Sequence, residues 1–226
     1  MIALPERHPA ATRLYLVRHA ATTLEPGRCC GSLDVGLSDE GREQARQLAE
    51  ALGGVELAAV YTSPLERARD TAAAIGNRQN LEPIELRGFA EIDFGELEGR
   101  RFEEIAATHP DLHATWMCQP TEAEFPAGER FADFSRRVRE TARDIRLAHD
   151  RETIAIVSHG GPIRVLVADT LAMPPRALFR LDQAFTGLSV IDWIEGAPTV
   201  RLLNAFPGVC RGGREDPGNA HKPAGG

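Results

Sequence analysis

Short apolar runs and amphipathic stretches alternate along most of this chain. The apolar runs, bounded by polar turn residues, predict strands at residues 14–18, 57–62, 84–86, 153–157, 188–193 and 200–203. Helices are predicted between them, at about residues 39–52, 63–75, 131–145 and 162–171. The first apolar run is typical of a strand that is buried on both faces. Strands that alternate with helices in this way predict an α/β fold with a mostly parallel sheet.

The second predicted helix has a strong start signal. Ser63 is expected to cap it, Pro64 suits the first helical position, and Glu66 would complete a capping box. Arg67 then falls in the first turn, where the helix dipole disfavours a positive charge. An anion bound at this end of the helix would offset that cost, so the placement of Arg67 favours an anion site.

The remaining segments set the domain boundaries. Residues 1–12 are polar with two prolines and are predicted to be flexible. Residues 102–128 are short helical pieces broken by three prolines, and are expected to form a cap inserted over one edge of the sheet. From residue 207 to 226 the chain is rich in Gly, Pro and charge, which predicts a disordered tail. Residues 13–206 are therefore expected to form a single domain.

Composition narrows the possible partners. A net charge of −7 on 226 residues argues against nucleic acid and membrane surfaces, although local arginines could still bind an anionic substrate. No apolar run is long enough to span a membrane, and the first twelve residues lack a signal-peptide core, so a cytoplasmic location is expected. The cysteines have no Cys-x-x-Cys spacing and are expected to be reduced, and adjacent Cys29 and Cys30 would make a poor tetrahedral metal site.

Charged and polar residues follow three of the predicted strands. Arg18 and His19 end the first, Ser63 and Pro64 lead from the second to Arg67, and His159 follows the fourth. Carboxyl ends of parallel strands share one edge of the sheet, where ligands bind in such folds, so two arginines and two histidines are expected to converge there. Arginine presents a fork of donors that matches phosphate oxygens. A histidine among arginines has its pKa lowered, which leaves it neutral and nucleophilic near pH 7. Taken singly, each residue could instead be a solvated strand end or a satisfied core histidine.

Four motifs, in order, resemble those of the histidine phosphatase superfamily, also called phosphoglycerate mutase-like. They are Leu-Val-Arg-His-Ala-Ala-Thr at 16–22, Ser-Pro-Leu-Glu-Arg-Ala-Arg-Asp-Thr-Ala at 63–72, the acidic loop at 91–99, and Ser-His-Gly-Gly at 158–161. The resemblance covers about residues 13–204. It implies a three-layer fold, in which helices cover both faces of a mostly parallel central sheet.

The resemblance also implies roles for individual residues. His19 would attack phosphorus and become phosphohistidine, while Arg18, Arg67 and His159 would hold the phosphoryl oxygens. Glu91 would protonate the leaving group and then activate water. These roles need no metal and no cofactor. They agree with the chemistry, because a loose transition state spreads charge over oxygens that two arginines can stabilise.

Other acidic residues near these motifs are expected to have different roles. Asp93 could compete with Glu91 as the acid, whereas Glu96 and Glu98 are expected to be solvated loop residues. Many members of the superfamily have asparagine where this chain has Glu25. A carboxylate there would repel phosphate, so Glu25 is expected to point away or to meet Arg28.

The nearest subfamily resemblance is to the α-ribazole-phosphate phosphatases of cobalamin biosynthesis. It rests on Gly-Arg-Cys-Cys-Gly-Ser-Leu-Asp-Val at 27–35, and on Trp116 with Pro-Ala-Gly-Glu at 126–129. Cys30 replaces an aromatic residue of that pattern. Substrate contacts are predicted from Thr22, Cys30, Gly31 and Gly160 in addition to the arginines and His159.

Several functions stay open at this stage. A broad-specificity sugar or nucleotide phosphatase fits as well as an α-ribazole phosphatase. A phosphoglycerate mutase is disfavoured, because residues 102–128 contain no Lys or Arg for a second phosphate. An inactive binding relative is disfavoured by the retained histidines and arginines, and a Rossmann dehydrogenase by the lack of Gly-x-Gly-x-x-Gly after the first strand. The expected partner is a small phosphorylated substrate, with a homodimer as one possible assembly.

Overall fold

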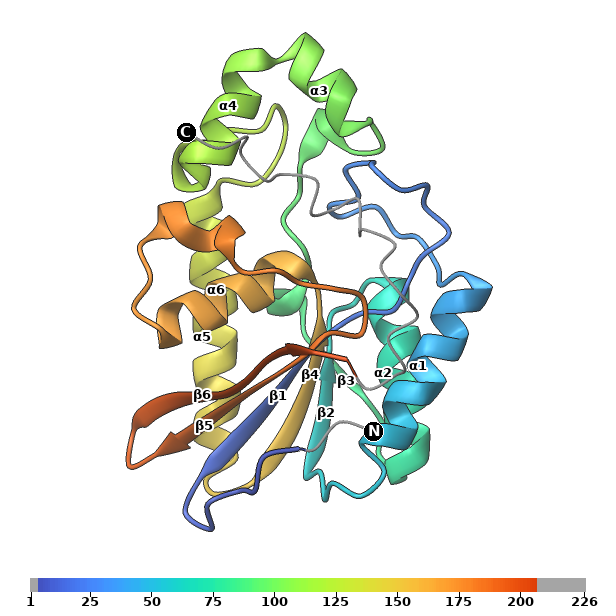
Figure 1. Ribbon diagram of the computed structural model, residues 1–226, viewed down its shortest axis with the longest axis vertical. Helices are drawn as coiled ribbons and strands as arrows, with labels where there is room; N and C mark the ends of the chain where they lie inside the picture. The colour runs from blue at the N-terminus through green and yellow to red at the C-terminus, as the bar shows by residue number, and fades with distance from the viewer. Residues whose placement is uncertain (1–3, 207–226) are drawn as a thin grey trace.

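A six-stranded sheet forms the centre of the protein, which a computed structural model describes for residues 4–206 (Figure 1). The strand order is β3-β2-β4-β1-β5-β6. The strands are β1 (Thr12–Arg18), β2 (Ala59–Thr62), β3 (Ile84–Glu85), β4 (Thr153–Ser158), β5 (Leu188–Ile194) and β6 (Ala197–Ala205). The first four in sequence pair in parallel, whereas β5 pairs antiparallel with β1 and β6 pairs antiparallel with β5. The α/β prediction is confirmed, with an antiparallel pair added to one side of the parallel strands.

Helices cover both faces of this sheet (Figure 1). The α-helices are α1 (Asp39–Ala51), α2 (Glu66–Gln79), α3 (Phe102–Thr108), α4 (Pro110–Cys118), α5 (Phe131–Ala148) and α6 (Gly160–Thr170). Short 3-10 helices lie at η1 (Arg87–Phe89), η2 (Gly95–Leu97), η3 (Pro120–Glu122) and η4 (Pro175–Arg180). α1 and α2 lie on one face of the sheet and α5 and α6 on the other, so the three-layer arrangement is confirmed.

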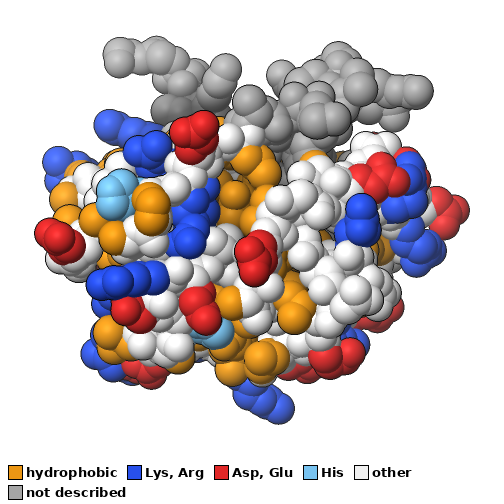
Figure 2. Space-filling view, turned by 90° about the horizontal axis from the view of Figure 1, so that it is seen from below, with side chains coloured by type: hydrophobic (Ala, Val, Ile, Leu, Met, Phe, Trp, Pro, Cys, Tyr) orange, Lys and Arg blue, Asp and Glu red, His pale blue; other side chains and the backbone are white. Residues whose placement is uncertain are grey.

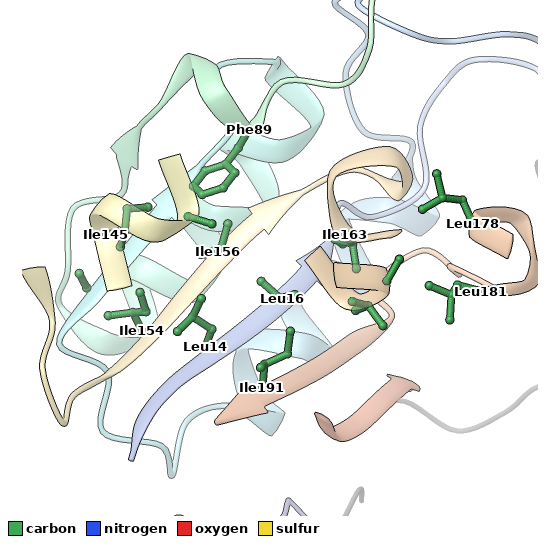
Figure 3. Close-up of a cluster of buried hydrophobic side chains, with 14 residues drawn as sticks. Leu14, Leu16, Phe89, Ile145, Ile154, Ile156, Ile163, Leu178, Leu181 and Ile191 are labelled. Carbon is green, nitrogen blue, oxygen red and sulfur yellow. The ribbon is translucent and has the colours of Figure 1, made fainter. Parts of the chain in front are cut away.

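Both faces of β1 are buried, as its apolar run predicts. Leu14 and Leu16 join the cluster beneath α5 and α6, where Ile163 of α6 packs (Figure 3). Tyr15 and Val17 point to the other face and pack with the apolar residues of α1 and α2. Side chains alternate along a strand, so one continuous apolar run supplies two cores. This burial fixes the position of the residues that follow β1.

The segment predicted to form a cap consists of α3, α4 and η3, and lies beyond the carboxyl ends of the parallel strands (Figure 1). Trp116 and Phe125 pack edge to face, with ring centroids 5.2 Å apart. Both belong to a cluster that includes Phe134 and Val138 of α5. The short helices are thereby attached to the long helix that supports one face of the sheet.

The first strand begins two residues before its predicted start at residue 14. Thr12 already belongs to β1, and Arg13 donates hydrogen bonds to the carbonyl oxygens of Pro5 (2.6 Å) and Glu6 (3.0 Å). The same guanidinium makes a buried ion pair with both carboxylate oxygens of Asp192 in β5. The segment is therefore attached through a charged residue that the apolar pattern does not identify. The predicted tail at 207–226 lies outside the described residues.

The start of α2 also differs from the prediction. The helix begins at Glu66 after Leu65, and neither a Ser63 cap nor a capping box is present there. Instead, the backbone N–H of Glu66 donates to the Asp34 carboxylate at 2.6 Å. Ser63 turns toward His159, so a residue from a distant loop satisfies the helix end.

Surface charge is mixed on the side of the molecule seen from below in Figure 2. Basic and acidic side chains lie next to one another across that face, with small hydrophobic areas between them. This distribution agrees with the modest net negative charge. In the part of the chain that the structure describes, no helix is long and apolar enough to cross a membrane.

Candidate active site

The predicted convergence of strand ends is present. β1 and β4 pair with Arg18 opposite Ser158, so the residue after each strand is a histidine in the same position along the edge. The His19 backbone N–H donates to the Ser158 carbonyl at 2.9 Å, and the His19 and His159 ring centroids are 5.0 Å apart. Ser63, which follows β2, donates its N–H to the Val157 carbonyl at 3.0 Å. Three parallel strands therefore deliver both histidines and the start of α2 to one place.

The ring of His19 has two distinct nitrogens. Nδ1 lies 2.8 Å from the Ala20 carbonyl oxygen, which can only accept, so Nδ1 carries the proton. Nε2 therefore has the lone pair, and the Nε–H of Arg67 donates to it at 3.2 Å. Burial lowers the pKa of His19 well below its ordinary value, and the charges of Arg67 and Arg18 lower it further. Burial is the larger cause of this lowered pKa, and the neighbouring arginines from which the sequence predicts it are the smaller cause.

Arg67 is fully buried at the N-terminal end of α2. Besides His19, its guanidinium donates to the carbonyl oxygens of Gly31 (2.7 Å) and Leu33 (2.6 Å). All three acceptors are uncharged, so these hydrogen bonds leave the positive charge of Arg67 unneutralised. Such a charge at a helix N-terminus favours an anion, as its placement in the sequence indicates.

Arg18 is held by a loop that the sequence motifs do not identify. Its Nη1 donates to the Gln183 carbonyl oxygen, and its guanidinium carbon lies 4.3 Å from the centre of the Phe185 ring. The Phe185 ring also borders His19, with centroids 5.5 Å apart. These residues lie between η4 and β5, far from every recognised motif, so only the fold brings them to the site.

Ser63 contacts the second histidine. The Ser63 hydroxyl accepts a hydrogen bond from the Leu65 N–H (3.2 Å), and it lies 2.7 Å from Nε2 of His159. The other ring nitrogen of His159, Nδ1, is buried and has no hydrogen-bond partner among the described residues. Burial and the nearby arginines lower the pKa of His159 well below its ordinary value. His159 therefore has one ring nitrogen on Ser63 and one that can contact a ligand.

Glu91 lies at the N-terminus of α6. One carboxylate oxygen accepts from the Gly161 N–H at 3.0 Å and the other from the Ile92 N–H at 3.0 Å. A Cβ at Gly161 would lie 2.1 Å from Glu91 Oε1, so only glycine permits this approach. Asp93, the competing acid, instead accepts from the Gly95 N–H at 2.7 Å and shapes the following turn.

The other loop acids fall into two groups. Glu25 accepts from Arg28 at 3.0 and 3.1 Å and from Arg101 at 2.9 Å, so the predicted meeting with Arg28 is confirmed. Glu96 is exposed, as expected. The prediction for Glu98 is wrong, because its half-buried carboxylate accepts from the Ser32 N–H (2.6 Å), the Ser32 hydroxyl (3.1 Å) and the Phe94 N–H (3.0 Å). Glu98 stabilises the loop that carries Gly31 and Leu33.

The predicted substrate contacts lie at different points around the histidines. Gly160 begins α6 directly after His159. Cys30 is half-buried, and its thiol is close enough to Arg67 and Glu91 for their charges to affect its pKa. Gly31 uses its carbonyl to hold Arg67. Thr22 lies in the loop after β1, where it pairs with Leu37. Within residues 4–206, no group of three His, Cys, Asp or Glu side chains is arranged to hold a metal ion.

A family model for the histidine phosphatase superfamily (branch 1) matches residues 14–205 of the chain. The chain belongs to this superfamily. The resemblance carried by the four motifs is thus confirmed, and the match runs from the third residue of β1 to the end of β6.

Relatives within the superfamily differ in their named substrates. The chain is 38% identical over 198 residues to a bifunctional protein of Mycobacterium tuberculosis, covering 85% of this chain but only 54% of that protein. It therefore spans about half the length of that relative. It is 36% identical over 193 residues to phosphoserine phosphatase 1 of Hydrogenobacter thermophilus, covering 85% of this chain and 92% of the relative. It is 32% identical over 196 residues to the adenosylcobalamin/alpha-ribazole phosphatase of Salmonella typhimurium, covering 85% and 96% respectively.

Similar solved structures also differ in the substrates that their names give. The alpha-ribazole phosphatase from Shigella flexneri is similar with a TM-score of 0.77 and 31% identity, covering 86% of this chain and 96% of that one. A mycobacterial glucosyl-3-phosphoglycerate phosphatase is similar with a TM-score of 0.79 and 27% identity, covering 86% and 99%. The fold is shared throughout this part of the superfamily, so the substrate has to be inferred from the site.

Proposed function

We propose that this protein is a metal-independent phosphomonoester hydrolase that works through a phosphohistidine at His19. The observation that carries the proposal is the state of the His19 ring, which is neutral and presents an unprotonated Nε2 next to Arg67. A neutral imidazole is a nucleophile, whereas an imidazolium is not. Superfamily membership and phosphatase-named relatives support the same activity.

In the proposed reaction, the phosphoryl group is held by three residues. Arg18 and Arg67 supply the positive charge that a loose phosphoryl-transfer transition state requires. In this proposal the Ser63 hydroxyl donates to Nε2 of His159, so Nδ1 carries the ring proton and donates to the phosphoryl group. That buried nitrogen has no hydrogen-bond partner among the described residues. A phosphoryl oxygen would satisfy that buried donor and remove the cost of leaving it unpaired.

Two transfers complete the proposed cycle. The lone pair of His19 Nε2 bonds to phosphorus as the P–O bond to the leaving alcohol breaks, and Glu91 gives its proton to the departing oxygen. Glu91, now ionised, takes a proton from water as the water oxygen bonds to phosphorus and the P–N bond breaks. The products are the alcohol, inorganic phosphate and an unchanged enzyme. The fixed position of Glu91 at the N-terminus of α6 supports this assignment over Asp93, whose carboxylate is used in a turn.

For the substrate, we favour a small phosphorylated metabolite, with α-ribazole phosphate as the first candidate. The loop at 27–35 and similarity to alpha-ribazole phosphatases support that choice. Similarity to a phosphoserine phosphatase gives phosphoserine as the second candidate, and broad activity on sugar or nucleotide phosphates is the third. A mutase is less favoured, because the cap at 102–128 has no Lys or Arg to hold a second phosphate.

A trapping experiment tests the mechanism. Quenching the wild-type protein during turnover should yield phosphate attached to one histidine, labile in acid and stable in base. His19→Ala should yield none and should not turn over, while His8→Ala, which changes an exposed histidine, should behave as wild type. Activity should persist in EDTA. Phosphate on serine, turnover by His19→Ala, or loss of activity in EDTA with rescue by magnesium would each contradict the proposal. A screen of α-ribazole phosphate, phosphoserine, phosphoglycerates and sugar phosphates then ranks the substrates by kcat/KM.

A further inference from the structure

The loop between η4 and β5 folds back over Arg18. Its Thr186 N–H donates to the Arg18 carbonyl at 3.1 Å, and its Gly187 carbonyl accepts from the Arg18 N–H at 3.1 Å. The Gln183 carbonyl accepts from the Arg18 side chain. The loop therefore contacts both the backbone and the guanidinium of Arg18. These contacts place the loop beside the proposed phosphate site.

The backbone of this loop is strained where it meets the site. Thr186 is β-branched and has a φ of +54°, in the left-handed region that such residues rarely adopt. The surrounding contacts maintain it, since the Ala184 N–H donates to the Asn204 side chain of β6 at 2.9 Å. Strained backbone of this kind is concentrated at functional sites. The residue before Thr186 is Phe185, which contacts both Arg18 and His19.

Phe185 is the side chain through which the loop meets both Arg18 and His19. The guanidinium carbon of Arg18 lies over this half-buried ring, 4.3 Å from its centre, and the ring is tilted by 51° to the His19 ring, with centroids 5.5 Å apart. An aromatic face attracts a guanidinium that lies over it and favours stacking of the two planar groups. A phenyl ring cannot donate a proton or hold a phosphoryl oxygen, so any contribution that it makes acts through its neighbours.

We propose that Phe185 is a positioning residue that holds the Arg18 guanidinium in the plane required to bind a phosphoryl group. This role rests on the proposed function for its kinetic consequence, but the binding of phosphate itself can be measured without turnover. An arginine that is already oriented loses less conformational freedom on binding an anion, so the ring increases the affinity of the site.

The test compares variants that keep or remove the ring face. Phe185→Leu should weaken binding of inorganic phosphate by about tenfold and lower kcat/KM on p-nitrophenyl phosphate by about the same factor. Phe185→Tyr retains the ring and should bind phosphate like wild type. Trp193→Leu is the matched control, because it removes an aromatic ring near Arg146 at the opposite end of β5 and should change neither quantity. Equal phosphate affinity in wild type and Phe185→Leu would overturn the proposal.

A double variant shows whether Phe185 acts through Arg18. In the Arg18→Gln background, Phe185→Leu should cause little further loss of phosphate affinity, because the charge to be positioned is gone. Losses that multiply would mean an independent structural role and would overturn the proposal. If Phe185→Leu does not fold by circular dichroism, Phe185→Met replaces it in both comparisons. If the wild-type protein showed no turnover but Phe185→Leu still weakened phosphate binding, the positioning role would be supported and the proposed hydrolase function contradicted.

Discussion

At the scale of single residues, the two histidines differ only in what their ring nitrogens contact. His19 places its protonated Nδ1 on a backbone carbonyl, which leaves Nε2 as a nucleophile. His159 has Nε2 on the Ser63 hydroxyl, and its buried Nδ1 has no hydrogen-bond partner among the described residues, so the proposed mechanism uses Nδ1 as a donor. Two residues of the same type therefore suit opposite roles, one attacking and one holding the phosphoryl group. The sequence motifs indicate both histidines, but only the contacts distinguish their nitrogens.

Glu91→Gln tests whether Glu91 protonates the leaving group, because substrates differ in how much they need that proton. An alkyl phosphate must gain a proton on its departing oxygen, whereas nitrophenolate is stable when it leaves. Single-turnover phosphorylation of the enzyme should therefore slow by about a hundredfold more on the alkyl phosphate than on p-nitrophenyl phosphate. Equal losses on the two substrates would assign Glu91 to positioning, and Asp93→Asn should then show the differential effect.

Gly161→Ala tests the position of the same acid without changing its chemistry. A Cβ there would lie 2.1 Å from Glu91 Oε1 and 3.0 Å from Phe134 Cζ, so the carboxylate must move. We expect a loss of kcat/KM of about tenfold or more, larger on alkyl phosphates than on p-nitrophenyl phosphate, because a misplaced acid serves poor leaving groups worst. Gly54→Ala is the control, since no atom lies within 4 Å of its added Cβ. Unchanged kinetics in Gly161→Ala would show that the Glu91 position is not critical.

At the scale of elements, α2 shows what local sequence rules cannot predict. Ser63 and Glu66 have the spacing of a capping box, yet the cap comes from Asp34, in a loop between β1 and α1. The Ser63 hydroxyl contacts His159 and accepts from the Leu65 N–H instead, because the fold brings the end of β4 next to it. Helix-capping rules consider only residues that are close in sequence, so they cannot predict a contact between distant segments at the sheet edge.

Asp34→Ala should therefore destabilise the protein by about 1 kcal/mol, the usual cost of losing a helix cap. The same loop holds Arg67 through the Gly31 and Leu33 carbonyls, so phosphate affinity should fall as well. Urea unfolding and phosphate titration measure the two effects. Glu82→Ala, an exposed carboxylate before β3, is the matched control and should leave both values unchanged. Wild-type stability in Asp34→Ala would mean that the Glu66 N–H is satisfied equally well by water.

The elements themselves were predictable because each has a strong periodic signal. All six strands and the four long helices appear where apolar periodicity places them, within a few residues. Strand direction was not fully predictable, since an apolar run such as 188–193 reads the same in either direction. The short connection from β5 to β6 allows an antiparallel pair, and β5 itself runs opposite to β1. The arrangement at the carboxyl ends is unaffected, because β1, β2 and β4 remain parallel.

At the scale of the whole molecule, the site places two histidines in the interior. His19 is 5% exposed and His159 is fully buried, and each has a pKa well below its ordinary value. The motif order predicted which residues would meet, but not the contacts that hold them. Phe185, which lies in none of the motifs, contacts Arg18 and His19, and Asp34 of the 27–35 stretch accepts a hydrogen bond from the Glu66 N–H. The site is thus a property of the assembled fold, and its electrostatics link the stability of the protein to pH.

Stability should fall as the pH drops below about 6.5, the ordinary pKa of histidine in an unfolded chain. Below that pH the unfolded state binds a proton on each histidine, whereas the folded state keeps His19 and His159 neutral. Because the unfolded state binds more protons, the free energy of unfolding decreases by up to about 1.4 kcal/mol per pH unit for each histidine. Urea unfolding between about pH 7.5 and pH 5 should show this slope. His159→Gln should reduce this slope by the amount that corresponds to about one proton. His8→Gln, at an exposed position, should leave the slope unchanged. Parallel pH profiles for wild type and His159→Gln would show that His159 is protonated in the folded protein, which would also remove the basis for treating it as a neutral donor.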